Sequence, residues 1–154
     1  MKKLFFIALI LLFILSQPLT LEAPMSDLSK TLNLIYYSCY LLDVPVRYEL
    51  ALFSGESEHF VGVTVCEKKF KNCRIKSYGV PQLTYAAAEW TGYTGSEIDL
   101  EKSEIAIPWA TAYIKKCMRI YKKDLSKVSS VYKTGRPCFK SYYRQILKVE
   151  NKIK

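Results

Sequence analysis

The chain begins with a short positive end and an unbroken apolar run, and this pairing most strongly constrains what the rest of the chain can be. Met1-Lys2-Lys3 precedes the run 4–15, which Pro18 closes. The run is shorter than the roughly 20 apolar residues that cross a bilayer. Its layout is typical of a signal peptide. We therefore predict a signal peptide over residues 1–23, an exported protein in the periplasm or outside the cell, and no stable membrane anchor after cleavage.

Residues 24–154 have the length of one domain, and no linker or repeat interrupts them. We therefore predict a single domain over this range. The whole chain holds 23 Lys and Arg against 14 Asp and Glu, a formal net charge of +9. A field of this sign concentrates anionic polymers near a protein. Because export excludes nucleic acid as a target, we expect an anionic polymer outside the cytoplasm as the partner and a monomeric protein.

Five cysteines remain in the mature region, and an oxidising compartment allows disulfides. Two of them, Cys66 and Cys73, bracket a charged turn and could close it as a bridged hairpin. The partners of the other three stay open; they are Cys39, Cys117 and Cys138. A zinc site is not indicated, since the chain has no CxxC pair and His59 is its only histidine. No metal or cofactor is expected.

The spacing of apolar residues predicts a string of helices. Capping and breaking residues place them at about 26–40, 45–56, 81–90, 103–122, 124–133 and 139–152. Between residues 60 and 77 the period changes to alternation at Val61, Val63 and Val65, which predicts a short irregular β-hairpin. The expected fold class is α+β, predominantly α-helical.

Glu56 is the candidate for chemistry. It ends the second predicted helix on the face that carries Leu52 and Phe53. Desolvation in such a setting disfavours a carboxylate and favours a carboxylic acid that can donate a proton. The alternative from spacing alone is that Glu56 ends its helix in solvent and has no catalytic role.

Three short segments carry a resemblance to a known family. They are Ala51-Leu52-Phe53-Ser54-Gly55-Glu56-Ser57, then Ser77-Tyr78-Gly79-Val80-Pro81-Gln82-Leu83, and later Ser129-Ser130-Val131-Tyr132-Lys133-Thr134-Gly135. In this order they resemble the lysozyme-like catalytic domain of the soluble lytic transglycosylases, over most of residues 44–137. The resemblance implies a lysozyme-like fold, with a Glu-Ser pair at a helix end, a glutamine at the start of the next helix and a tyrosine on a later one.

The resemblance also implies an activity, the cleavage of peptidoglycan glycan strands between N-acetylmuramic acid and N-acetylglucosamine to leave a 1,6-anhydromuramic end. Glu56 would be the single acid and base. Ser57 would orient Glu56 or the substrate, Gln82 would hold the glycan, and Tyr132 would point its hydroxyl toward Glu56 or the sugar. Taken without the family, Gln82 is a polar residue early in a helix and Tyr132 a packed core tyrosine.

The chain departs from the family pattern in three places. Glu58 and His59 stand before Phe60 where the family usually has one residue. A proline, Pro81, replaces the methionine common before the glutamine, and Lys133 replaces the asparagine common after the tyrosine. These departures bear on contacts with the substrate more than on the acid itself.

Two rival interpretations remain open. One is a hydrolase of the goose-lysozyme kind, in which Glu58 or Glu67 helps a water molecule to attack. The other is a catalytically inactive cationic protein that binds the cell wall through its last helix, whose basic residues recur at four-residue spacing as Lys140, Arg144, Lys148 and Lys152. A helper role, in which local cleavage of the wall opens a path for a secretion apparatus or a phage, fits the size of the chain.

Overall fold

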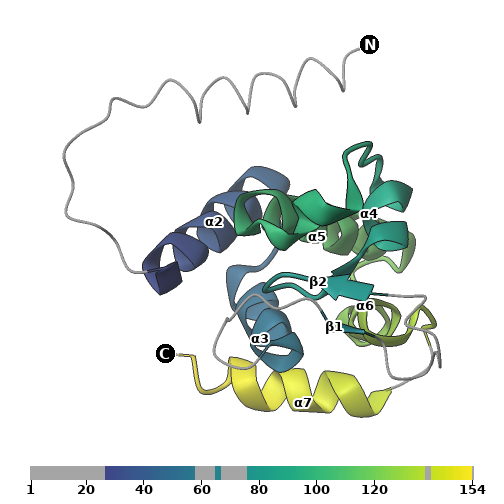
Figure 1. The fold of residues 1–154 in the computed structure, drawn as a ribbon. Coiled ribbons are helices and arrows are strands. Elements are labelled where there is room, and N and C mark those ends of the chain that lie inside the picture. The colour runs from purple at the N-terminus through teal and green to yellow at the C-terminus, as the bar shows by residue number, and fades with distance from the viewer. Residues whose placement is uncertain (1–26, 58–64, 67–75, 138–139, 154) are drawn as a thin grey trace.

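The computed structural model describes residues 27–57, 65–66, 76–137 and 140–153 of the 154-residue chain. These residues form a mainly helical α+β fold (Figure 1). The helices are α2 (Asp27–Leu42), α3 (Val46–Glu56), α4 (Tyr85–Thr91), the 3₁₀ helix η2 (Glu97–Glu101), α5 (Ser103–Ile120), α6 (Leu125–Thr134) and α7 (Lys140–Glu150). The strands are β1 (Val65–Cys66), β2 (Lys76–Tyr78) and β3 (Leu83–Thr84).

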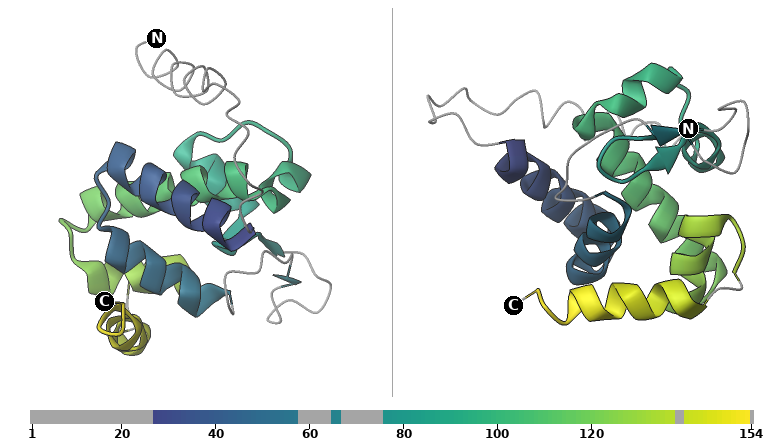
Figure 2. Two further views of the ribbon diagram at one scale, coloured as in Figure 1. Left: turned by 90° about the vertical axis from the view of Figure 1, so that its left-hand side faces the viewer. Right: turned by 60° about the horizontal axis from the view of Figure 1, so that its bottom comes forward.

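The helix α3 packs between α2 and α7. The helix α2 packs on α5, and α7 packs on both α3 and α6 along one side of the molecule (Figures 1 and 2). The core lies among these helices, and α3 runs through it, because Tyr48 through Phe53 are all buried. The core side chains that are fully buried include Ile35, Tyr48, Leu52, Phe53, Leu83, Leu100, Ile107, Ile114, Val128 and Ile146. The body of α3 is thereby fixed in the core.

The three strands form one small antiparallel sheet in the order β1-β2-β3. Ser77 pairs with Thr84 and Tyr78 with Leu83, so residues 79–82 make a tight reversal between β2 and β3. The prediction of a short hairpin in this region is confirmed where β1 pairs with β2. Its cysteine-bounded turn lies outside the described residues, as do Glu58, Glu67 and Cys73.

The helix boundaries follow local capping chemistry. Asp124 accepts a hydrogen bond from the backbone N–H of Lys127 at the start of α6, as predicted. Gly92 and Gly135 end α4 and α6 in the left-handed conformation, with φ of 108° and 71°. The predictions for α2, α3, α5, α6 and α7 are therefore confirmed within a few residues.

The helix α4 begins later than the sequence predicted. Residues 81–84 are not helical, because the pairing of β2 with β3 takes this segment into the sheet. Thr84 then caps α4, its hydroxyl accepting from the N–H of Ala87. The predicted placement of Gln82 at the start of a helix is wrong; it lies in the reversal, with a left-handed φ of 51°.

The predicted signal peptide, residues 1–23, lies outside the described residues and stays a prediction. Cys39 and Cys117 are buried free thiols on α2 and α5. No helix within the described ranges has the length and apolar character needed to cross a membrane.

Candidate functional site

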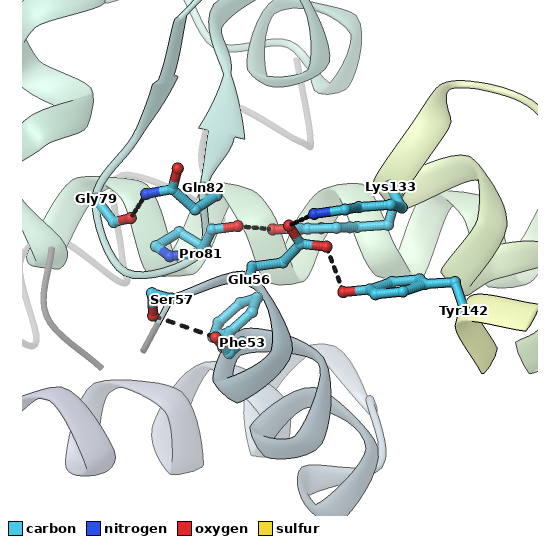
Figure 3. A network of polar contacts seen from close by, with 9 residues as sticks. Phe53, Glu56, Ser57, Gly79, Pro81, Gln82, Lys133 and Tyr142 are labelled. Atoms are coloured by element: carbon cyan, nitrogen blue, oxygen red, sulfur yellow. Dashed lines mark hydrogen bonds and ion pairs between the residues drawn. The ribbon is translucent and has the colours of Figure 1, made fainter. Parts of the chain in front are cut away.

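Glu56 is the last residue of α3, and its side chain is only 6% exposed. The helix ends there because Ser57 turns the backbone to an extended conformation, with φ of −128°. The carboxyl group points away from α3 toward α6 and α7 (Figure 3). The helix α3 thus presents one buried carboxyl group at its end, and the prediction that this helix ends at Glu56 is confirmed.

Two donors meet the two oxygens of this carboxyl group. The ammonium of Lys133, on α6, lies 2.7 Å from Oε2. The hydroxyl of Tyr142, on α7, donates a hydrogen bond to Oε1. Both contacts are of the kind that an ionised carboxylate accepts. The setting is therefore more polar than the apolar surroundings that the sequence predicted.

The two donors differ in exposure. Tyr142 is 9% exposed, and burial together with the Glu56 carboxylate raises the pKa of its hydroxyl above the usual value. The hydroxyl therefore stays protonated and remains a donor. The side chain of Lys133 is 46% exposed and reaches Glu56 from the solvent side. Its ammonium also lies 5.5 Å from the centre of the Tyr142 ring, within range of a cation–π contact.

Gly55 explains how Tyr142 comes so close to α3. A Cβ atom at this position would lie 3.3 Å from the Tyr142 hydroxyl oxygen and 3.3 Å from Cδ1 of Ile146. Either distance is tighter than ordinary van der Waals contact. The missing side chain beside Glu56 therefore makes room for α7 to bring its tyrosine to the carboxyl group.

Hydrogen bonds join α6 to α3 and close the end of α6, and together they fix the position of Lys133. Midway along α6, Ser129 Oγ lies 2.8 Å from the hydroxyl of the buried Tyr48 on α3. Near its end, Thr134 donates to the Ser130 carbonyl and accepts from the N–H of Arg136. The base of Lys133 is therefore held by packing and hydrogen bonds, while its long side chain reaches to Glu56.

The resemblance implies that Tyr132 points its hydroxyl toward Glu56 or the sugar, whereas in the structure this hydroxyl is bonded to the backbone of Pro81. The Tyr132 hydroxyl donates to the carbonyl of Pro81, 2.6 Å away, in the reversal between β2 and β3. Its ring packs at an angle against Phe53 and edge-on to Tyr113. Tyr132 thus joins α6 to the sheet, and the hydroxyl on Glu56 comes from Tyr142, which the sequence analysis did not single out.

The other two predicted site residues make local contacts. Ser57 is buried, and its hydroxyl donates to the Phe53 carbonyl 3.2 Å away rather than to Glu56 (Figure 3). Gln82 donates its amide to the Gly79 carbonyl at 2.7 Å and thereby closes the reversal that carries Pro81. In this arrangement Ser57 shapes the helix end and Gln82 shapes the loop opposite it.

The three segments of the family resemblance nevertheless come together in space. Lys133 of the third segment contacts Glu56 of the first, and Tyr132 of the third contacts Pro81 of the second. Within the described part of the chain, no three His, Cys, Asp or Glu side chains gather as a metal-binding group. Searches of protein families, curated proteins and solved structures gave no significant match to this chain.

Proposed function

We propose that this protein is a peptidoglycan lytic transglycosylase with a lysozyme-like fold, and that Glu56 is its single acid and base. The observation that carries the proposal is that the first and third segments meet at one buried carboxyl group at a helix end, while the third segment also holds the second. These segments are far apart in the sequence. Their contacts with one another beside Glu56 support a catalytic centre more than an ordinary helix end.

The reaction needs one carboxyl group. Ordinary glycosidases use two carboxylates, the second of which serves as a nucleophile or activates water. In the transglycosylase reaction a protonated Glu56 gives its proton to the leaving oxygen O4 as the C1–O4 bond breaks. The 6-hydroxyl oxygen of the same muramic residue bonds to C1, and its proton returns to Glu56. No water is consumed, and no cofactor is required.

The surroundings of Glu56 suit this exchange of protons. The same carboxyl group must act first as an acid and then as a base, so its position has to be fixed through both steps. The buried hydroxyl of Tyr142 can hold Oε1 throughout, while Oε2 lies on the side that Lys133 covers. We therefore assign the exchangeable proton to Oε2 and a positioning role to Tyr142.

Product masses test the proposal directly. Purified peptidoglycan sacculi are digested with the protein, and the released muropeptides are analysed by mass spectrometry before and after borohydride reduction. We expect 1,6-anhydro ends, which are lighter by one water than hydrolysed ends and resist reduction. Reducible ends would show a hydrolase instead. Binding to the sacculi with no release of fragments would favour the cationic wall-binding interpretation.

Replacement of each tyrosine separately should show which one serves the acid. Tyr142→Phe removes the donor on Oε1, and we expect kcat on peptidoglycan to fall about tenfold or more, since a hydrogen bond to a charged group is worth about 1.5–3 kcal/mol. Tyr132→Phe leaves that donor in place and removes only the bond to Pro81. We expect it to lower thermal stability with a smaller effect on kcat. The reverse order would contradict the assignment of Tyr142.

A further inference from the structure

Lys133 is the outer of the two partners of Glu56. Tyr142 approaches from the buried side, whereas the Lys133 side chain is about half exposed and covers a carboxyl group that is itself 6% exposed. A glycosidic oxygen must come within hydrogen-bond distance of a carboxyl oxygen to be protonated. Oε2 is the oxygen that meets this half-exposed lysine, at 2.7 Å, whereas Oε1 meets the buried Tyr142. The resting site is therefore closed by its own lysine.

This ion pair opposes catalysis in two ways. The ammonium occupies Oε2 with a charge-assisted hydrogen bond, whereas the first step needs a proton on that oxygen. It also occupies the place where the leaving oxygen must lie. Lys133 therefore has to leave Oε2 before the reaction begins. Its exposed, flexible side chain permits this movement without a change in α6.

An anion on the substrate is the group best suited to draw Lys133 away. An ammonium that leaves a short, partly buried ion pair loses a charge-assisted hydrogen bond, and a new carboxylate partner restores it. The two sugars of the proposed substrate differ in this respect. A muramic residue carries a carboxylate on its lactyl group or on its peptide stem, whereas N-acetylglucosamine is neutral.

We propose that Lys133 is a specificity-determining residue, which transfers from Glu56 to a carboxylate on the muramic side of the bond and so opens the acid only for an anionic strand. The inference rests on the proposed function. It also gives a physical role to the lysine that stands where the family commonly has asparagine, since a neutral amide at this position would form an ion pair neither with Glu56 nor with a carboxylate of the substrate.

A matched pair of substrates isolates the effect of this charge. Glycan strands freed of their peptide stems carry a free lactyl carboxylate on each muramic residue, and carbodiimide coupling with ammonia converts it to a neutral amide. The scissile bond is unchanged. We expect the unmodified protein to cleave the carboxylate strand with a kcat/KM about tenfold higher than the amidated strand. Strands that retain their stems show whether stem carboxylates serve equally well.

Three variants complete the test. Lys133→Met should bring the ratio of the two kcat/KM values to about one, mainly because the amidated strand is then cleaved faster than by the unmodified protein. Lys133→Arg keeps a cation and should keep the preference. Lys127→Met removes an equal charge from the same helix, where the lysine pairs with Asp124 instead, and should leave the ratio unchanged.

The outcomes separate the two proposals. Equal cleavage of both strands by the unmodified protein, or a preference that survives in Lys133→Met, overturns the role of Lys133 and leaves the transglycosylase assignment standing. A ratio that falls equally in Lys127→Met would show general attraction by a basic surface and would likewise overturn it. Failure to cleave either strand overturns the proposed function, and the role of Lys133 falls with it.

Discussion

Glu56→Gln should reduce the release of muropeptides from purified peptidoglycan by about 10²- to 10⁴-fold, the usual contribution of a positioned general acid or base. Glutamine has the same shape, and its carbonyl oxygen can still accept from Tyr142. It has no acidic proton to give to the leaving oxygen, and its amide is not basic enough to take one back. The substitution therefore removes both steps assigned to this residue while the geometry is kept.

The fold should survive this change. The partner that Glu56 loses is Lys133, whose half-exposed ammonium can turn to solvent. We expect a thermal midpoint within a few degrees of the unmodified protein and an unchanged circular dichroism spectrum. Glu89→Gln is a suitable control, since it makes the same chemical change at an exposed position on α4. More than about a tenth of the original activity in Glu56→Gln would remove Glu56 from the mechanism.

Glu49 should make the stability of the protein strongly dependent on pH. It is fully buried on α3, two turns before Glu56, among α2 and α5. Burial raises its pKa to about 8, against the opposing effect of hydrogen bonds with Thr111 and Cys39. Its second oxygen, Oε2, has no hydrogen-bond partner among the described residues. A neutral carboxylic acid is the form that this environment favours.

The contacts of Thr111 agree with a protonated Glu49. The hydroxyl oxygen of Thr111 lies 2.5 Å from Oε1 of Glu49 and 2.9 Å from the carbonyl oxygen of Ile107. A hydroxyl group has one proton and can donate it to only one of these acceptors. Both contacts are satisfied together when Glu49 carries a proton and donates it to Thr111, which then donates to Ile107.

The sign of the pH effect follows from the raised pKa. Below about pH 4.5 the carboxyl group is protonated in both the folded and the unfolded chain. Between about pH 4.5 and 8 only the unfolded chain ionises, so the free energy of unfolding falls by about 1.4 kcal/mol per pH unit. The loss from this one group reaches roughly 4–5 kcal/mol and levels off once the folded protein also ionises, above about pH 8.

Glu49→Gln should remove this dependence. We expect the free energy of unfolding of the variant, minus that of the unmodified protein, to rise by several kcal/mol between pH 4.5 and 8, as measured by urea denaturation. The unpaired amide hydrogens of glutamine add a cost that does not vary with pH. Glu104→Gln, at an exposed position on α5, should give a nearly flat difference. A flat difference for Glu49→Gln as well would mean that the buried group is not neutral.

Local signals in the sequence predicted most of the helices but not the start of α4. The caps at Asp124, Gly92 and Gly135 act within one turn of the chain, so they can be read without knowledge of the fold. The strands β2 and β3 have only three and two residues, which is too short to show a period of two. Pro81 therefore suggested a helix start, and pairing between strands overruled it.

The candidate site could be predicted only in part, again because local signals are readable in the sequence and contacts between distant elements are not. Glu56 could be predicted from its own segment, and the third segment from its resemblance to the family pattern. Within the third segment, however, the residue that contacts Glu56 is Lys133 rather than Tyr132. Tyr142 was missed because its contact with Glu56 spans 86 residues and depends on how α7 docks. Gly55 was the available signal: a glycine next to a candidate acid in a helix indicates that another element packs closely there.

Because Tyr142 lies on α7, near the end of the chain, the support of Glu56 is completed only late in synthesis. A ribosome completes Glu56 long before it reaches Tyr142, and the hydroxyl that fixes the carboxyl group arrives only when the helix Lys140–Glu150 has been made and docked. An unfinished chain that lacks this helix would carry the acid without its inner support. We expect cleavage to be confined to the finished chain, in which α7 has docked on α3.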